Sequence, residues 1–251
     1  MDSESGGALD REERGDFVYH HKPRKFKPNT YPVPESSGSR EAAQPARFEK
    51  FDLNPALIGS MQERYGEAAH TTQIQSLSLS HLCGPEAEAK GMRVILGAET
   101  GSGKTLAYLL PLMHHLKATE AAAQPNSPAE ENQLQKMLYP RAIVLSPTHE
   151  LNRQSTATAK SLTHGIKLRV AGLSNTKDGG IGSTRGMVDC LFSTGAMLRR
   201  MFGIRKPGMD LDEGYAKTEW VGADKVEWLV IDEAEVMLSA SRGFIGQRSD
   251  R

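Results

Sequence analysis

Short apolar runs separated by longer amphipathic segments dominate the chain from residue 48 onward. The apolar runs have the length of buried strands and fall at residues 94–96, 142–145, 168–170, 190–192 and 228–231. Residues 105–117 and 149–162, between these runs, are long enough for crossover helices. Runs that are apolar on both faces and are separated by helices are typical of a parallel sheet covered on two sides. The pattern therefore predicts an α/β domain with three layers.

Two stretches depart from this pattern. Residues 1–47 are polar, contain five prolines and have no sustained apolar period, which predicts a disordered arm. Residues 121–132 contain Pro125 and Pro128 and are expected to form a surface loop. The remaining residues, 48–251, are expected to form one domain.

Composition narrows the function classes. Lys+Arg and Asp+Glu both number 31, so no overall basic field indicates nucleic-acid binding, and any RNA site must be local. Cys83 and Cys190 are too few for a disulfide framework and suit a reducing compartment. No run approaches the roughly 18 apolar residues of a membrane helix, and the acidic first residues do not resemble a targeting peptide. A soluble intracellular protein is expected.

A glycine-rich loop follows the first apolar run. It consists of Ala98, Glu99, Thr100, Gly101, Ser102, Gly103, Lys104 and Thr105. This is a Walker A sequence with alanine at its first glycine position. Glycines let backbone N–H groups converge on phosphate oxygens at a helix N-terminus. Lys104 would contact the β- and γ-phosphates and the Thr105 hydroxyl would ligate Mg²⁺, so the loop predicts a P-loop nucleotide site.

An acidic pair follows the last apolar run. Asp232 and Glu233 lie directly after residues 228–231, at the end of a strand where a parallel sheet places its ligand chemistry. Asp232 would hold Mg²⁺ opposite Thr105, and Glu233 would orient and deprotonate the attacking water. Lys104, Asp232 and Glu233 are therefore the predicted catalytic residues.

Other segments resemble one family of nucleotide-dependent enzymes. Residues 51–55 (Phe-Asp-Leu-Asn-Pro) and 71–75 (Thr-Thr-Gln-Ile-Gln) resemble the Q motif of DEAD-box RNA helicases. The resemblance implies that Phe51, Thr72 and Gln75 contact adenine. A side-chain amide donates and accepts hydrogen bonds at once, as the adenine edge requires, so Gln75 would select ATP over GTP.

The later motifs follow in the family's order. Residues 146–151 (Ser-Pro-Thr-His-Glu-Leu) resemble its Pro-Thr-Arg-Glu-Leu segment, and residues 193–198 resemble its Thr-Pro-Gly-Arg-Leu segment. Residues 232–235 (Asp-Glu-Ala-Glu) resemble Asp-Glu-Ala-Asp. The chain thus resembles a RecA-like first helicase domain over residues 48–244. The RNA contacts implied by the resemblance are Thr148, His149, Thr194 and Gly195.

Three positions differ from the family pattern. Glu235 replaces the last aspartate of the acidic box, while His149 and Met197 replace arginines. Fewer cations predict weaker and less salt-dependent RNA binding. The residues of these motifs are most similar to those of fungal mitochondrial members of the family. That similarity implies a mitochondrial location, ribosomal RNA and ribosome-assembly proteins as partners, and a monomeric chain.

The sequence shows neither the family's Ser-Ala-Thr segment nor a second RecA-like domain, so we expect a first domain truncated after its acidic box. An arginine finger from a second domain contributes about 10³ to 10⁵ in rate, so this chain is expected to bind ATP better than it hydrolyses it. A non-catalytic regulatory fragment that binds ATP or RNA remains an alternative. An unrelated P-loop ATPase or kinase is a further one.

Overall fold

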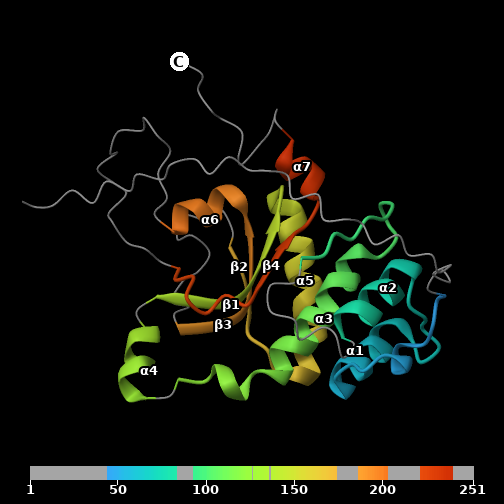
Figure 1. The fold of residues 1–251 in the computed structure, drawn as a ribbon, viewed down its shortest axis with the longest axis horizontal. Helices are drawn as coiled ribbons and strands as arrows, with labels where there is room; N and C mark the ends of the chain where they lie inside the picture. Colours follow the sequence, from blue (N-terminus) through green and yellow to red (C-terminus); the bar gives the residue numbers. More distant parts are fainter. Residues whose placement is uncertain are drawn as a thin grey trace, which may run out of the picture. The chain divides into compact units, whose positions relative to one another are not determined.

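Four parallel strands form the centre of the domain (Figure 1). The computed structural model describes residues 44–83, 93–125, 127–135, 137–173, 186–202 and 221–239. The strands are β1 (Leu138–Ser146), β2 (Val170–Gly172), β3 (Gly186–Thr194) and β4 (Trp228–Ile231), in the order β2-β3-β1-β4. Their register pairs Ser146 with Thr194 and Leu145 with Ile231, so the carboxyl ends of β1, β3 and β4 share one edge.

Helices cover both faces of this sheet. The helices are α1 (Pro55–Tyr65), α2 (Gln73–Leu82), α3 (Lys104–Ala118), α4 (Pro128–Leu134), α5 (His149–Ile166), α6 (Gly195–Met201) and α7 (Ala234–Leu238), with 3-10 turns η1 (Phe48–Lys50) and η3 (Ala121–Ala123). Ala142 and Val144 of β1 pack in one core with α1, α2, α3 and α5. Ile143 and Leu145 pack in the other core with α6 and α7, as the two-residue period of a strand requires. The predicted three-layer α/β domain is confirmed.

Polar caps set where the main helices begin. The Asn54 side chain accepts a hydrogen bond from the Ala56 amide, and Pro55 occupies the first turn of α1, where it loses no helical bond. Thr148 caps α5 and Thr194 caps α6 in the same way. The turns from β1 to α5 and from β3 to α6 therefore each end in a threonine that caps the following helix. None of the helices in the described ranges has both the length and the apolarity to cross a membrane.

The prediction of a strand at residues 94–96 is wrong. Residues 93–99 have no strand partner, and the Ile95 side chain is 97% exposed. Among the described residues β4 is an edge strand of the sheet, and its Leu229 is 60% exposed. An apolar run becomes a strand only when a neighbour accepts its ladder hydrogen bonds, and this run has no such neighbour in the described sheet.

Smaller differences concern the loop and the arm. Residues 121–132 are not all loop, because η3 lies there and α4 starts at Pro128, whose fixed φ suits a first turn. The run at residues 168–170 forms a strand only from Val170. Residues 1–43 of the predicted arm lie outside the described residues. Ala46, in the last part of that arm, bonds to Thr71 through backbone and side chain, so ordered contacts begin before Phe48.

A buried arginine joins the elements at the amino end of β4. The Arg141 side chain is 1% exposed and donates to Glu227 at 2.7 Å, to Asp189 at 3.4 Å and to the Leu116 carbonyl at 2.8 Å. It also donates to the hydroxyl of Thr119. Every polar direction of the guanidinium is thus used, which offsets the cost of burying a charge. The network connects β1, β3, α3 and the entry to β4.

We expect Arg141→Ala to lower the free energy of unfolding by about 3 kcal/mol, because it leaves Asp189 and Glu227 without their cation. Urea denaturation followed by circular dichroism measures this loss. The matched control is Arg153→Ala, which removes an exposed arginine that, among the described residues, pairs with Glu150 on the same helix. That control should unfold close to the parent midpoint, and equal losses in both variants would contradict the role of the network.

The same network predicts the behaviour of the fold in acid. Burial raises the pKa of Glu227, but the hydrogen bond and the charge of Arg141 outweigh it, and the net shift is below the ordinary value of 4.5. A carboxyl with a depressed folded pKa stabilises the fold above about 4.5, and that contribution is lost as pH falls through the folded pKa. Glu227→Gln should therefore flatten the loss of stability below pH 4.5 in a series of urea melts. A parallel decline in the variant and the parent would count against this assignment.

Candidate functional site

The glycine loop wraps around its own lysine. Gly101 and Gly103 have positive φ angles of 83° and 91°, a conformation that favours glycine, and Gly103 is the N-cap of α3. The Lys104 amine donates to the Ala98 carbonyl at 2.8 Å, so the side chain folds back across the loop. The Ser102 hydroxyl oxygen is buried and has no hydrogen-bond partner among the described residues. The loop thus holds a cation and an unused hydroxyl close to the start of a helix.

The tip of β4 lies against this loop. The Lys104 amine is 3.9 Å from the Glu233 carboxylate, although the two residues are far apart in the sequence. Asp232 continues the ladder through its amide, which donates to the Leu145 carbonyl at 2.8 Å. The Glu233 amide donates to Asp232 Oδ1 at 3.1 Å, and Glu233 itself has a left-handed φ of 49°. The structure therefore brings the predicted catalytic residues Lys104, Asp232 and Glu233 together at one edge of the sheet.

The pKa of Glu233 is raised by its surroundings, whereas the pKa of Glu235 is lowered. Its hydrogen bond with Glu235 raises the pKa of Glu233 above 4.5, and burial adds to this, while the charge of Lys104 opposes it. A backbone hydrogen bond and the bond with Glu233 lower the pKa of Glu235. The interaction between the two glutamates therefore shifts their pKa values in opposite directions. A carboxylate with a raised pKa is a better proton acceptor, which suits the position of Glu233.

Tyr108 is a site residue that the sequence motifs did not predict. It lies one helical turn after Lys104 on α3, and its hydroxyl donates to Asp232 Oδ2 at 3.0 Å. Burial and the charge of Asp232 raise the pKa of Tyr108 well above its usual value, so the phenol keeps its proton. The signal in the sequence was helical spacing: the fourth residue after Lys104 lies on the same face of α3.

The predicted adenine-binding residues lie beside the loop as well. Gln75 Oε1 accepts from the Thr72 amide at 3.0 Å and Gln75 Nε2 donates to the Gly103 carbonyl at 3.2 Å. Thr72 and Gln75 form a capping box at the start of α2, and Phe51 packs against the core next to it. Gln75 is therefore a link between α2 and the glycine loop. Its contact with adenine remains a prediction.

The predicted RNA contacts occupy the same sheet edge. Thr148 and Thr194 follow β1 and end β3, and their hydroxyls accept from the Leu151 and Met197 amides at 3.2 and 3.4 Å. These hydroxyls are helix caps in the structure, a local role that threonine side chains often take at the start of a helix. Met197 is buried in the core, whereas His149 is exposed. Gly195 is buried at the start of α6.

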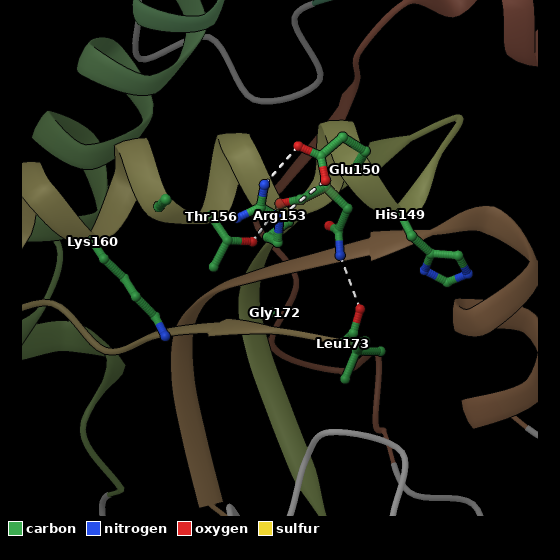
Figure 2. A pocket seen from close by; sticks show the side chains of 9 residues that line it. His149, Glu150, Arg153, Thr156, Lys160, Gly172 and Leu173 are labelled. Carbon is green, nitrogen blue, oxygen red and sulfur yellow. Dashed lines mark hydrogen bonds and ion pairs between the residues drawn. The ribbon is translucent and has the colours of Figure 1, made fainter. Parts of the chain in front are cut away.

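A hollow of about 600 Å³ lies between α5 and β2 (Figure 2). His149 stands at one end and Lys160 at the other, while Glu150 and Arg153 pair with each other on the outer side of the helix. Its inner wall includes Gly172 and Leu173, whose carbonyl accepts from the Asn152 side chain at 2.9 Å. Among the residues that line the hollow, the sequence analysis assigned a binding role only to His149. The hollow depends on how α5 packs against an edge strand, which no sequence motif shows.

The family follows from comparison with known proteins. The model of the DEAD/DEAH box helicase family matches residues 72–248, which is more than half of the chain. The chain belongs to the DEAD/DEAH box helicase family. It is 46% identical over 223 residues to the ATP-dependent RNA helicase MRH4, mitochondrial, of Cryptococcus neoformans, covering 83% of this chain and 40% of that protein.

More distant relatives agree with this assignment. The chain is 29% identical to the human probable ATP-dependent RNA helicase DDX28, covering 82% of this chain and 34% of that protein. The chain thus spans less than half the length of these two relatives. A DEAD box protein from Methanococcus jannaschii has a TM-score of 0.53 at 19% identity, over 79% of this chain and 45% of that one. Prp28 from Chaetomium thermophilum has the same score at 20% identity, over 76% and 39%. These structures support the RecA-like fold.

The close contact at Gly103 generates a stability prediction. A Cβ added there would lie 2.4 Å from Gln75 Nε2 and would adopt a left-handed φ. We expect Gly103→Ala to cost about 1–3 kcal/mol in thermal or urea unfolding. Gly97→Ala is the control, because a Cβ at Gly97 meets no atom within 4 Å.

Removing the opposing side chain tests the cause. In a Gln75→Ala background the steric part of the Gly103→Ala cost should disappear and the φ strain should remain, which a double-mutant cycle measures. Strict additivity of the two substitutions would contradict the contact between Gln75 and the loop.

Proposed function

We propose that this chain is the ATP-binding domain of an ATP-dependent RNA helicase. The observation that carries the proposal is the approach of Lys104 to the acidic tip of β4 at 3.9 Å. A cation beside a glycine loop and a pair of carboxylates at the tip of β4 match the two halves of a triphosphate site. Membership of the DEAD/DEAH box helicase family supports the same proposal.

Each residue of the loop has a role in this proposal. Lys104 would leave the Ala98 carbonyl and donate to the β- and γ-phosphates, and the buried Ser102 hydroxyl is available to a phosphate oxygen. Gly101 and Gly103 leave room for backbone N–H groups to approach the triphosphate. At the far end of ATP, Phe51, Thr72 and Gln75 would contact adenine. The binding of Gln75 to the Gly103 carbonyl would then couple base recognition to the loop.

The residues present also fit a magnesium ion. Mg²⁺ is held in such sites by one or two protein oxygens together with phosphates and water. Asp232 offers a carboxylate beside the loop, and Thr105 is the second residue of α3. These two residues would hold the ion, which neutralises charge on the phosphates. Glu233, whose pKa is raised, would accept the proton of the attacking water.

For RNA we propose the sheet edge that carries Thr148, His149, Thr194 and Gly195. The strand register aligns both segments with Asp232, so RNA and nucleotide would lie on neighbouring loops of one edge. The motif similarity to mitochondrial relatives favours a mitochondrial protein that acts on ribosomal RNA with ribosome-assembly partners. This assignment is consistent with the MRH4 relative, which is named mitochondrial.

The alternative is a module that binds ATP or RNA without turnover. The exchange of aspartate for Glu235, which shares a hydrogen bond with the proposed base, favours it. RNA-stimulated phosphate release by the chain discriminates the two. Stimulation that depends on Glu233 supports the helicase domain, and nucleotide binding without any phosphate release supports the module.

We predict that Lys104→Ala weakens ATP binding by about a hundredfold or more, because charge-assisted bonds to two phosphates are lost. Glu233→Gln should keep ATP affinity near that of the parent and reduce hydrolysis by about 10² to 10⁴. Fluorescent-nucleotide titration and single-turnover phosphate release measure the two effects. Hydrolysis at the parent rate in Glu233→Gln would exclude Glu233 as the base.

The adenine prediction needs its own measurement. If Phe51, Thr72 and Gln75 read the base, ATP and ADP should compete far better than GTP for a labelled nucleotide. Equal competition by ATP and GTP would remove the adenine role and leave Gln75 as a structural link.

A further inference from the structure

We propose that Tyr108 is the positioning residue that orients the Asp232 carboxylate for Mg²⁺, so that one face of α3 sets both the phosphate-binding amine and the metal-binding carboxylate. The proposal rests on the function proposed above. It assigns a role to a residue outside the glycine loop and the acidic box.

The geometry of α3 supplies the first argument. Lys104 and Tyr108 are four positions apart and therefore lie on the same face of the helix. Lys104 approaches Glu233 at 3.9 Å, while the Tyr108 hydroxyl lies 3.0 Å from Asp232 Oδ2. Each carboxylate of the pair thus meets a different side chain of one rigid helix. A shift of α3 would move both contacts together.

The Asp232 carboxylate is held through both of its oxygens. Oδ1 accepts from the Glu233 amide at 3.1 Å and Oδ2 accepts from Tyr108 at 3.0 Å. Two fixed donors on opposite oxygens set the rotation of the carboxylate. Each oxygen still has a second acceptor position for a cation or a metal-bound water. Tyr108 therefore orients the group without using up its capacity as a ligand.

Burial fixes the tyrosine itself. Its side chain is 7% exposed and belongs to the core formed with α1, α2 and α5. The Ser155 hydroxyl of α5 lies 3.5 Å from the Tyr108 hydroxyl. A phenol has one proton, and the charged carboxylate at the shorter distance takes it. Ser155 can then donate to the phenol oxygen, which connects α5 to the metal-binding carboxylate.

The test is Tyr108→Phe, which removes the hydroxyl and keeps the ring in the core. ATP affinity of the full chain is titrated with a fluorescent nucleotide, first in EDTA and then over a series of Mg²⁺ concentrations. We expect metal-free affinity to stay at the parent value. The Mg²⁺ concentration for half-maximal tightening should rise about tenfold, the size of one charge-assisted hydrogen bond.

Tyr139→Phe is the matched control. Tyr139 of β1 is also 7% exposed, and among the described residues its hydroxyl donates to the Met137 sulfur at 3.8 Å and to no carboxylate. It should behave as the parent in both titrations. A loss of general packing would instead lower the thermal midpoint and the metal-free affinity of Tyr108→Phe together.

A double-mutant cycle with Asp232→Asn checks that the effect passes through Asp232. In that background Tyr108→Phe should change the Mg²⁺ dependence no further. Unchanged or tighter Mg²⁺ dependence in Tyr108→Phe alone would overturn the positioning role. If the parent chain bound no nucleotide in any condition, the proposed ATP site would fail. If the parent bound with a clear Mg²⁺ effect that Tyr108→Phe left intact, only the role of Tyr108 would fail.

Discussion

The contact between the start of α3 and the tip of β4 is the constraint on which the rest of the site depends. Lys104 meets Glu233 in an ion pair and Tyr108 donates a hydrogen bond to Asp232, so two polar contacts one turn apart hold a helix against a strand end. The positive charge of Lys104 reduces the repulsion between the nearby carboxylates of Asp232 and Glu233. The loop before α3 and the acidic residues after β4 consequently form one site.

The loop is held from its other side by α2. Gln75 accepts from Thr72 and donates to the Gly103 carbonyl, so the capping box that starts α2 also reaches the turn that starts α3. The absence of a side chain at Gly103 makes this approach possible. Helix capping and loop shape thus depend on the same amide, which is also the proposed adenine contact. Gln75, which resembles the family's adenine-binding glutamine, therefore has a structural role in the absence of nucleotide.

The differences from the family pattern act at distinct levels. Met197 is buried among the side chains of α6 and β3, so its packing role is independent of any phosphate. His149 remains exposed at the mouth of the hollow beside α5 and keeps access to a ligand (Figure 2). Glu235 alters the acidic box itself, since its hydrogen bond raises the pKa of Glu233. Met197 thus affects the core, His149 affects the surface, and Glu235 affects the pKa of Glu233.

Periodicity and motif order were enough to predict the α/β class, β1, β3, β4 and the long helices α3 and α5, because burial on a sheet imposes a local pattern. They also selected Lys104, Asp232 and Glu233 as candidate catalytic residues, which the structure brings together, since a triphosphate site favours particular residue types next to glycines and strand ends. The strand predicted at residues 94–96 was wrong because a strand needs a partner, which no local pattern supplies. Tyr108, the link from Gln75 to Gly103 and the buried Arg141 likewise required the tertiary structure. Each is a contact between segments distant in sequence, and packing alone decides which polar atoms meet.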